Sequence, residues 1–339
     1  MAVRDLYNTL SDEQKMKIES SRSPEDLLAF LKAENIAFTE DHLEAICGWR
    51  AFGKKKKRTD IIETGLYGRF LEPSEEWPEL LVEARSNEKA VRGSFPSEDD
   101  QEAAARRLIA GDNPVLQEAL RSAADPEAFC DFCLSMRGPL PEGRQRRILR
   151  EQARLLGYLA NPAPLPDSAE ALLQLWETAN RLEPRWYDDL PAHFRTSDEH
   201  IPFAHGRNPF KPGPLPPGYR TSPPEEIPEA ISGLMEWIRR RDLSPELLAF
   251  SSVFLMYRIH PFSDGNGHTA RLLCCRILTP HYSAVTLTVF IGLMHEFRRS
   301  VFDATMLADL SNGDLLPECC VLLRLLIRSQ KRLLNPEQF

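Results

Sequence analysis

The sequence predicts a mainly α-helical protein on two kinds of signal: helix starts marked by capping residues, and apolar residues at helical spacing. Ser244-Pro245-Glu246 carries the first signal, with a serine N-cap, a proline at the first helical position and an acid in the first turn. Apolar residues then recur at helical spacing up to Ile259, so we expect a helix that ends near His260. A second helix is predicted to begin around residues 266–268, because apolar residues recur at i, i+3, i+4 and i+7 from Ala270.

Further helical patterns divide the chain into three predicted regions. Residues 1–50 are predicted to form a small helical module, because helix starts follow one another at Ser11, Ser23 and Thr39. Residues 51–115 combine a basic linker with a helical region of unknown role, and an exposed acidic joint is predicted at residues 97–100. Residues 116–339 contain the two helices described above and form the largest predicted domain.

Charge and composition restrict the class of function. The chain has 339 residues and a formal net charge of −8, which argues against general nucleic-acid binding, because that needs a basic face. No run approaches the ~18 apolar residues that span a bilayer, and the first residues lack the apolar core of a signal peptide. Seven cysteines without framework spacing predict reduced thiols. We therefore expect a cytoplasmic protein; an effector delivered into another cell would share these features.

The segment between the two predicted helices carries groups suited to a phosphate ligand. His260 has a side chain whose ordinary pKa of about 6.5 suits it to take a proton from a hydroxyl. Asp264 is a hard carboxylate of the kind that binds Mg²⁺ together with substrate phosphates. Gly265-Asn266-Gly267 places free backbone amides at a helix N-terminus, where anions bind. His268 and Arg271 are three residues apart and can lean over the same helix end.

A simpler interpretation is a tight Asp-Gly-Asn-Gly turn between two core helices, with His260 only capping the first. Turn chemistry is enough to explain the Gly-Asn-Gly segment taken by itself. It does not explain why a base, a carboxylate, a glycine loop and an arginine occur together. The sequence therefore favours an active site.

The same loop resembles the motif of the Fic (filamentation induced by cAMP) family, His-x-Phe-x-(Asp/Glu)-Gly-Asn-Gly-Arg-x-x-Arg, at every defined position except 268. The resemblance extends from about Cys133 to about Leu326. It implies a Fic-type helical bundle with a short β-hairpin flap. It also implies transfer of AMP from ATP to a Ser, Thr or Tyr hydroxyl of a target protein. In that reaction His260 would be the base, Asp264 the Mg²⁺ ligand, residues 265–267 the anion hole and Arg271 a phosphate clamp.

His268 departs from the motif, which has arginine at this position. Arginine offers a permanent charge and a planar fork of donors, whereas a neutral histidine offers one donor at most. We expect a weaker grip on the β- or γ-phosphate. Relatives with histidine here transfer other groups, such as phosphocholine from CDP-choline, so UTP and CDP-choline remain alternative donors. A degenerate Fic fold that binds a nucleotide or a partner without chemistry is the rival interpretation.

Two short strands are predicted upstream of the loop, one at Phe194-Arg195-Thr196-Ser197 and one at His200-Ile201-Pro202-Phe203. They resemble the family's flap, which grips the target by adding a strand to it. Arg195, Thr196, Ser197, His200 and Ile201 are therefore the candidate docking residues. An ordinary surface hairpin is an equal alternative.

Many Fic proteins are silenced by a helix whose glutamate pairs with the second motif arginine. In the corresponding region, Cys133-Leu134-Ser135-Met136-Arg137-Gly138, Arg137 takes the place of that glutamate. Arg137 would repel Arg271 instead of pairing with it. Two hypotheses follow: the enzyme lacks this brake, or Arg137 supplies the phosphate charge lost at position 268. A solvated residue at a helix end is the alternative.

The first 45 or so residues weakly resemble the leader-peptide-like helical modules of bacteria, which serve as recognition tags. A helical oligomerisation or docking domain explains the same pattern, so self-association is a second expectation for this region.

Overall fold

The structure, a computed structural model, describes Ser11, Gln14 and residues 24–36, 62–63, 69–74, 76–111, 113–122, 126–135, 144–160, 165–180, 193–197, 221–310 and 313–335. Its contacts divide the chain into two compact units, Met1–Ile61 and Ile62–Phe339. The boundaries predicted from the sequence lie after residues 50 and 115. Residues 62–115 belong with the unit that contains the loop, because α5 (Glu76–Ser94) packs along the last helix, α16 (Leu316–Leu334).

The first unit contains α3 (Pro24–Ala33), which begins directly after Ser23, where a helix start was predicted. Ser11 and Gln14 make the reciprocal hydrogen bonds of a capping box: the Gln14 amide donates to Ser11 Oγ over 3.2 Å, and the Ser11 amide donates to Gln14 Oε1 over 3.0 Å. The predicted helix start at Thr39 lies outside the described residues.

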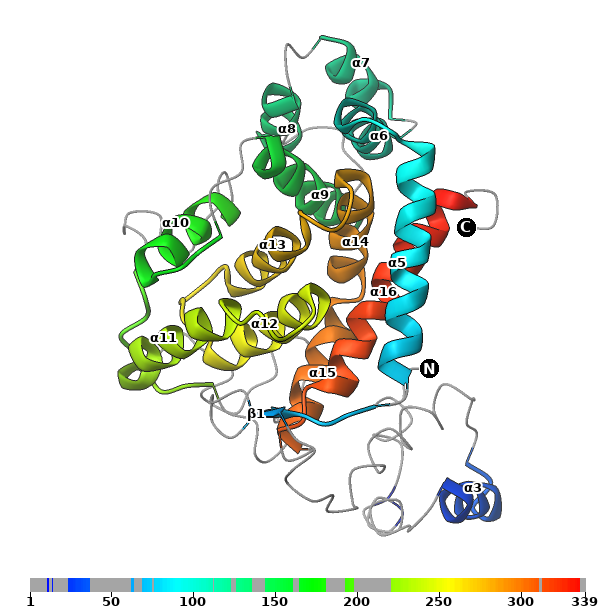
Figure 1. Cartoon of the computed structure of the whole chain (residues 1–339), viewed down its shortest axis with the longest axis vertical. Helices are drawn as coiled ribbons and strands as arrows, with labels where there is room; N and C mark the ends of the chain where they lie inside the picture. The colour runs from blue at the N-terminus through cyan, green and yellow to red at the C-terminus, as the bar shows by residue number, and fades with distance from the viewer. Residues whose placement is uncertain are drawn as a thin grey trace. The chain divides into compact units, whose positions relative to one another are not determined.

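The second unit is built from helices (Figure 1). After α5 they are α6 (Glu98–Ala110), α7 (Pro114–Ser122), α8 (Pro126–Ser135), α9 (Arg144–Ala160), α10 (Ala169–Ala179), the 3-10 turn η3 (Pro224–Glu226), α11 (Ile227–Ile238), α12 (Pro245–Ile259), α13 (Asn266–Leu278), α14 (Ala284–Glu296), α15 (Arg298–Leu310) and α16. The mainly helical fold predicted from the sequence is confirmed. No helix among the described residues is long and apolar enough to cross a bilayer.

The core is centred on α12, which is buried on nearly every side, as expected of a helix that is apolar all round. It packs against α13, α11 and α16, while α14 packs against α9 and α16 (Figure 1). Ser244 caps α12 by accepting a hydrogen bond from the Leu247 amide over 3.2 Å. The predicted bounds of α12 and α13 are confirmed, and the loop between them is held at both ends by the core.

Polar contacts at buried positions attach α5 to the core. Glu88, 4 % exposed, accepts hydrogen bonds from the Ser283 amide over 2.7 Å and from Thr286 Oγ1 over 2.8 Å at the start of α14. Gln330 of α16 donates to the Ala84 carbonyl over 2.9 Å. Buried polar groups that are satisfied in this way fix one arrangement of the helices.

Two sequence predictions differ from the structure. The acidic joint predicted at residues 97–100 is the start of α6, where Ser97 and Asp100 form a capping box. Residues 193–197, predicted as the first strand of a flap, have no regular structure, and the predicted second strand lies outside the described residues. The described strands are β1 (Ile62–Glu63) and β2 (Phe70–Leu71), an antiparallel pair in which Ile62 faces Leu71.

Candidate active site

His260 ends α12 in an unusual backbone conformation. Its φ and ψ angles of 51° and 58° lie in the left-handed region, and its amide donates to the Met256 carbonyl over 2.9 Å. A residue with a Cβ atom pays a conformational penalty there, and such residues cluster at functional sites. The strained cap turns the chain sharply into the loop that leads to α13.

Asn266 holds that loop closed. Its Oδ1 accepts a hydrogen bond from the Phe262 amide over 3.0 Å, and its Nδ2 donates to the Phe262 carbonyl over 2.7 Å. The residue is 4 % exposed. The predicted role of Asn266 in holding an anion therefore applies to its backbone amide at the helix start, because both polar ends of its side chain bind within the loop.

A Cβ atom would clash at Gly265 and would be crowded at Gly267. Gly265 has a φ of 80°, and a Cβ atom on it would stand 2.3 Å from Asn180 Oδ1. A Cβ atom on Gly267 would stand 3.1 Å from Arg271 Nη1. The first helical hydrogen bond of α13 is made by the Thr269 amide to the Gly265 carbonyl, so the amides of residues 266–268 precede it at the helix start. An anion can approach these amides closely.

Asp264 is exposed beside these amides. Its Oδ1 accepts a hydrogen bond from the Gly265 amide over 2.7 Å, and its carbonyl accepts one from Trp176 Nε1 over 2.8 Å. Among the described residues no group of three or more His, Cys, Asp or Glu side chains is placed to hold a metal ion. A single exposed carboxylate beside an anion cradle fits Mg²⁺, which retains water and shares phosphate oxygens, better than a metal held by protein ligands alone.

Arg195 holds the other end of the loop. Its backbone amide donates to the Pro261 carbonyl over 2.9 Å, and its Nε donates to the His260 carbonyl over 2.7 Å. The residue is 2 % exposed, so its side chain is not free to dock a target, and it supports the loop instead. Thr196 and Ser197 are exposed, as docking residues must be, whereas His200 and Ile201 lie outside the described residues.

Burial, and then the charge of Arg195, lower the pKa of His260 to about 3. Both effects disfavour a positive charge on the ring. The imidazole is therefore neutral near pH 7, which is the form that accepts a proton.

Arg271 is paired with a glutamate that the sequence did not single out. Arg271 Nε lies 2.9 Å from Glu151 Oε2, and the two residues are 4 % and 1 % exposed. Burial acts to raise the pKa of Glu151, but Arg271, His268 and Arg154 outweigh it and hold that pKa well below its ordinary value. Glu151 is therefore charged, and it neutralises the predicted phosphate clamp.

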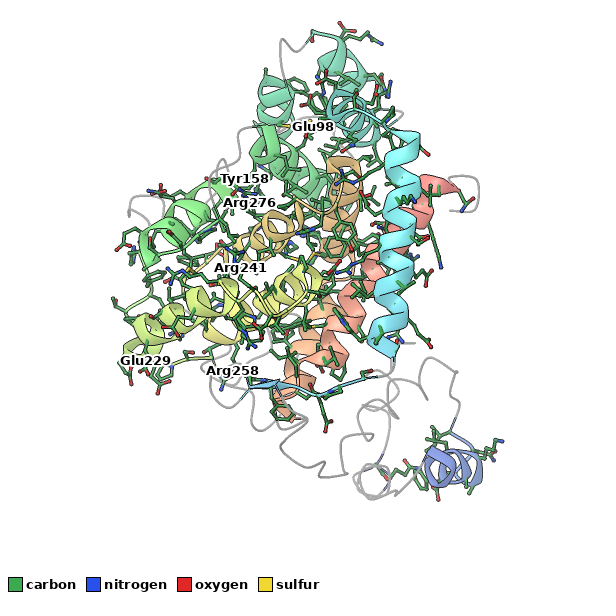
Figure 2. All side chains as sticks on the ribbon, in the orientation of Figure 1. Glu98, Tyr158, Glu229, Arg241, Arg258 and Arg276 are labelled. Atoms are coloured by element: carbon green, nitrogen blue, oxygen red, sulfur yellow. The ribbon has the colours of Figure 1, made fainter. Side chains whose placement is uncertain are left out.

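His268 and Arg154 complete this cluster. Arg154 Nη1 lies 2.6 Å from Glu151 Oε1 and 2.9 Å from His268 Nδ1. His268 also contacts Glu151 through Nδ1. The cluster joins α9 to α13, which share a further hydrogen bond between the side chains of Tyr158 and Arg276 (Figure 2).

The two hypotheses about Arg137, a missing glutamate brake or a replacement for the charge lost at position 268, stay predictions. Arg137 lies outside the described residues, and the residue that meets Arg271 is Glu151 on α9. One sequence signal could have found it. Ile148 and Leu155 stand at helical spacing in the sequence, and Glu151 falls between them on the same face. An acid on a buried stripe needs a cationic partner.

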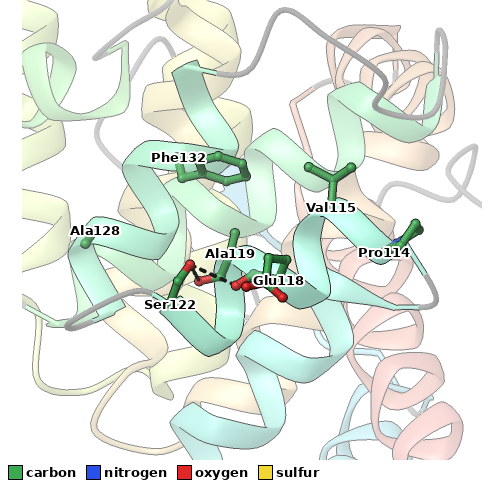
Figure 3. Close-up of a pocket in the computed structure, with 7 residues that line it drawn as sticks. All are labelled: Pro114, Val115, Glu118, Ala119, Ser122, Ala128 and Phe132. Carbon is green, nitrogen blue, oxygen red and sulfur yellow. Dashed lines mark hydrogen bonds between the residues drawn. The ribbon is translucent and has the colours of Figure 1, made fainter.

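A cavity of about 490 Å³ lies elsewhere, between α7 and α8 (Figure 3). Its lining residues are Pro114, Val115, Glu118, Ala119, Ser122, Ala128 and Phe132. The lining is mostly apolar and its charged residue is an acid, so it does not suit an anionic nucleotide.

Comparison with known proteins agrees with this geometry. A sequence model of the Fic/DOC family matches residues 185–278, which include the loop, its supporting Arg195 and all of α13. This chain contains a Fic domain. A 61-residue stretch is 43 % identical to the "Protein adenylyltransferase Fic" of Nematostella vectensis, covering 16 % of this chain and 14 % of that protein.

One solved structure of a Fic family protein is similar to the chain beyond residues 185–278. A Fic family protein from Desulfovibrio desulfuricans G20 matches with a TM-score of 0.51 and 14 % identity, over 80 % of this chain and 78 % of that one. At this identity the likeness concerns the fold. Fic-1 from C. elegans matches with a TM-score of 0.48 and 16 % identity, over 99 % and 96 % of the two chains.

Proposed function

We propose that this Fic domain transfers AMP from ATP to a hydroxyl side chain of a target protein, with Mg²⁺. The observation that carries the proposal is the shape of one loop. A neutral histidine stands at its first position, and the amides of a helix start stand at its end. Arg195 and Asn266 fix the loop between these points. A base and an anion cradle are thus held near each other by rigid helices.

The proposed reaction is an in-line displacement. The target hydroxyl oxygen forms a bond to the α-phosphorus of ATP, and its proton passes to the imidazole of His260. The bond from the α-phosphorus to the bridging oxygen breaks, and pyrophosphate leaves with the electron pair. Amides at the start of α13 stabilise the negative charge on the phosphate oxygens. Asp264 is the residue that would hold Mg²⁺, which supplies charge neutralisation when bound.

Intact-mass spectrometry of the full chain tests the proposal. The protein would be incubated with Mg²⁺ and, in separate tubes, ATP, UTP, GTP or CDP-choline. We expect a mass gain of one AMP with ATP, and no gain in a His260→Ala variant. A gain of UMP or phosphocholine would reassign the donor. A gain that persists in His260→Ala would contradict the assigned base.

A second candidate is nucleotide binding without turnover. The Glu151–Arg271 pair favours it, because an arginine held by a carboxylate is less available to orient the donor phosphates for transfer. Calorimetric titration with Mg-ATP separates the two candidates. Binding without any mass gain, in the wild type and in Glu151→Gln alike, would support the non-catalytic function.

A further inference from the structure

We propose that Arg154 binds a phosphate group of the donor beyond the α-phosphate, and so supplies the permanent charge that position 268 lacks. This inference rests on the proposed function and adds a binding residue to the same site. The Fic motif places an arginine at position 268, whereas this chain has a histidine there and an arginine reaching the same point from α9.

The distances place Arg154 within the phosphate-facing cluster. Its Nη1 lies 2.9 Å from His268 Nδ1 and 2.6 Å from Glu151 Oε1. Arg271 Nε binds the other oxygen of that carboxylate over 2.9 Å. Two guanidinium groups and one ring therefore converge on a single carboxylate, directly behind the first turn of α13.

Side-chain length explains why an arginine can fill this place. An imidazole ring ends well short of the reach of an arginine side chain. The guanidinium of Arg154 lies in contact with the ring of His268, where a longer side chain at that position would continue. The guanidinium of Arg154 is therefore within hydrogen-bonding distance of the side chain at position 268.

Arg154 is buried and paired with Glu151, whereas His268 is partly exposed. The side chain of Arg154 is 4 % exposed, whereas that of His268 is 28 % exposed and borders solvent. A charge in a low-dielectric surrounding interacts more strongly with an arriving anion than one in water. The guanidinium fork also matches the spacing of phosphate oxygens. On this proposal, a donor phosphate competes with the Glu151 carboxylate for the guanidinium groups of Arg154 and Arg271.

The same helix provides a matched control. Arg147 is exposed on α9 and carries the same charge, whereas Arg150 donates to the Leu134 carbonyl over 2.8 Å. Arg147→Gln removes one positive charge from α9 without changing the cluster. It therefore measures the effect of net charge alone.

Titration calorimetry of the full chain with Mg-ATP and with AMP tests the inference, in a His260→Ala parent that prevents turnover. We expect Arg154→Gln to raise the Kd for ATP about 10- to 100-fold, as for the loss of a charged hydrogen bond. The Kd for AMP should change less than ~3-fold, and Arg147→Gln should change neither by more than ~2-fold. Adding His268→Arg to Arg154→Gln should restore the ATP affinity to within ~5-fold of the parent.

Several results would overturn the inference. One is an unchanged affinity of Arg154→Gln for ATP. Another is an equal loss of affinity for ATP and for AMP that His268→Arg does not restore; this would indicate that Arg154 acts in folding alone. If circular dichroism shows that Arg154→Gln is unfolded, Arg154→Lys replaces it; there we expect a Kd for ATP at least ~3-fold higher, and an unchanged Kd would contradict us. A parent that binds no ATP would instead refute the proposed function.

Discussion

Glu151 remains charged at the centre of the active-site cluster because Arg271, His268 and Arg154 together outweigh the cost of burying it. The carboxylate occupies the donor groups of Arg271 that a phosphate would use. Removing the charge of Glu151 should therefore free Arg271 for a phosphate, and it should also leave the buried guanidinium of Arg271 with a weaker partner.

We predict that Glu151→Gln raises the initial rate of self-modification with Mg-ATP at least ~10-fold, because a competing charged hydrogen bond is lost. The same variant should lose about 1–3 kcal/mol of unfolding free energy, since Gln keeps the shape but not the charge. Mass spectrometry and denaturant unfolding measure the two effects. Glu177→Gln, on the exposed side of α10, is the control. A slower Glu151→Gln enzyme would contradict this account of the pair.

The pH dependence follows from His260. Its pKa is lowered to about 3, so the proton-accepting neutral form is present throughout the range from pH 5.5 to 8. We predict no acid limb near the ordinary histidine pKa of ~6.5 in the rate of transfer over this range. Initial rates at constant ionic strength measure it. A tenfold loss of rate between pH 7 and pH 5.5 would show that the base titrates normally.

At the scale of residues, the sequence predicted the groups that are close along the chain. Residues 260–271 are consecutive, so their chemistry and spacing are visible without a fold. Glu151 lies 120 residues before Arg271, and only the packing of α9 on α13 brings them together. Arg195 was noticed, but its burial and its contacts with the loop could not be predicted, because burial is decided by tertiary contacts.

At the scale of elements, the junction of α12 and α13 depends on backbone geometry. Gly265 has a φ of 80° and faces the side chain of Asn180, so a Cβ atom there meets both a conformational penalty and a steric clash.

We predict that Gly265→Ala lowers the free energy of unfolding by about 1–3 kcal/mol and abolishes transfer, because the loop must change shape. Gly93→Ala in α5 is the matched control: no atom lies within 4 Å of its added Cβ, and it should be neutral or stabilise by up to ~1 kcal/mol. Urea unfolding and the mass gain with Mg-ATP measure both variants. If Gly265→Ala transferred AMP at the wild-type rate, transfer would not require this loop shape.

Helix starts were predicted best where the capping residue precedes an apolar pattern, as at Ser244. The start of α6 was missed because Ser97 caps a run of acids, which resembled a solvated joint. The flap was predicted from two short strand-like segments and a family resemblance. At residues 194–197 the contacts of Arg195 with the loop take the place of strand pairing.

At the scale of the whole molecule, the chain divides after Ile61, and α5 belongs to the unit that contains the candidate site, with contacts through Glu88 and Gln330. Composition and periodicity did not indicate this, because the packing of α5 along α16 and its buried polar contacts are tertiary features. The mainly helical fold class was predictable from the sequence, but the position of the boundary between the two units was not.

We predict that a chain of residues 62–339 folds and keeps self-modification activity, with a melting temperature within ~5 °C of the full chain. The first unit has its own internal contacts, so its removal should leave the core intact. Thermal unfolding and mass spectrometry measure this. Glu88→Ala in the full chain should cost about 2–4 kcal/mol instead, since it leaves buried partners unsatisfied. Aggregation of the 62–339 chain would contradict the division.

The most direct test of the central claim, that one loop holds both the base and the anion cradle, is a paired measurement on His260→Ala. Calorimetry gives its Kd for Mg-ATP, and single-turnover mass spectrometry gives its rate of AMP transfer. The account predicts a Kd within ~3-fold of the wild type and a rate at least ~10²-fold lower. Transfer at the wild-type rate would contradict the assigned base. If removing the imidazole abolished Mg-ATP binding, this would contradict a cradle formed by the start of α13.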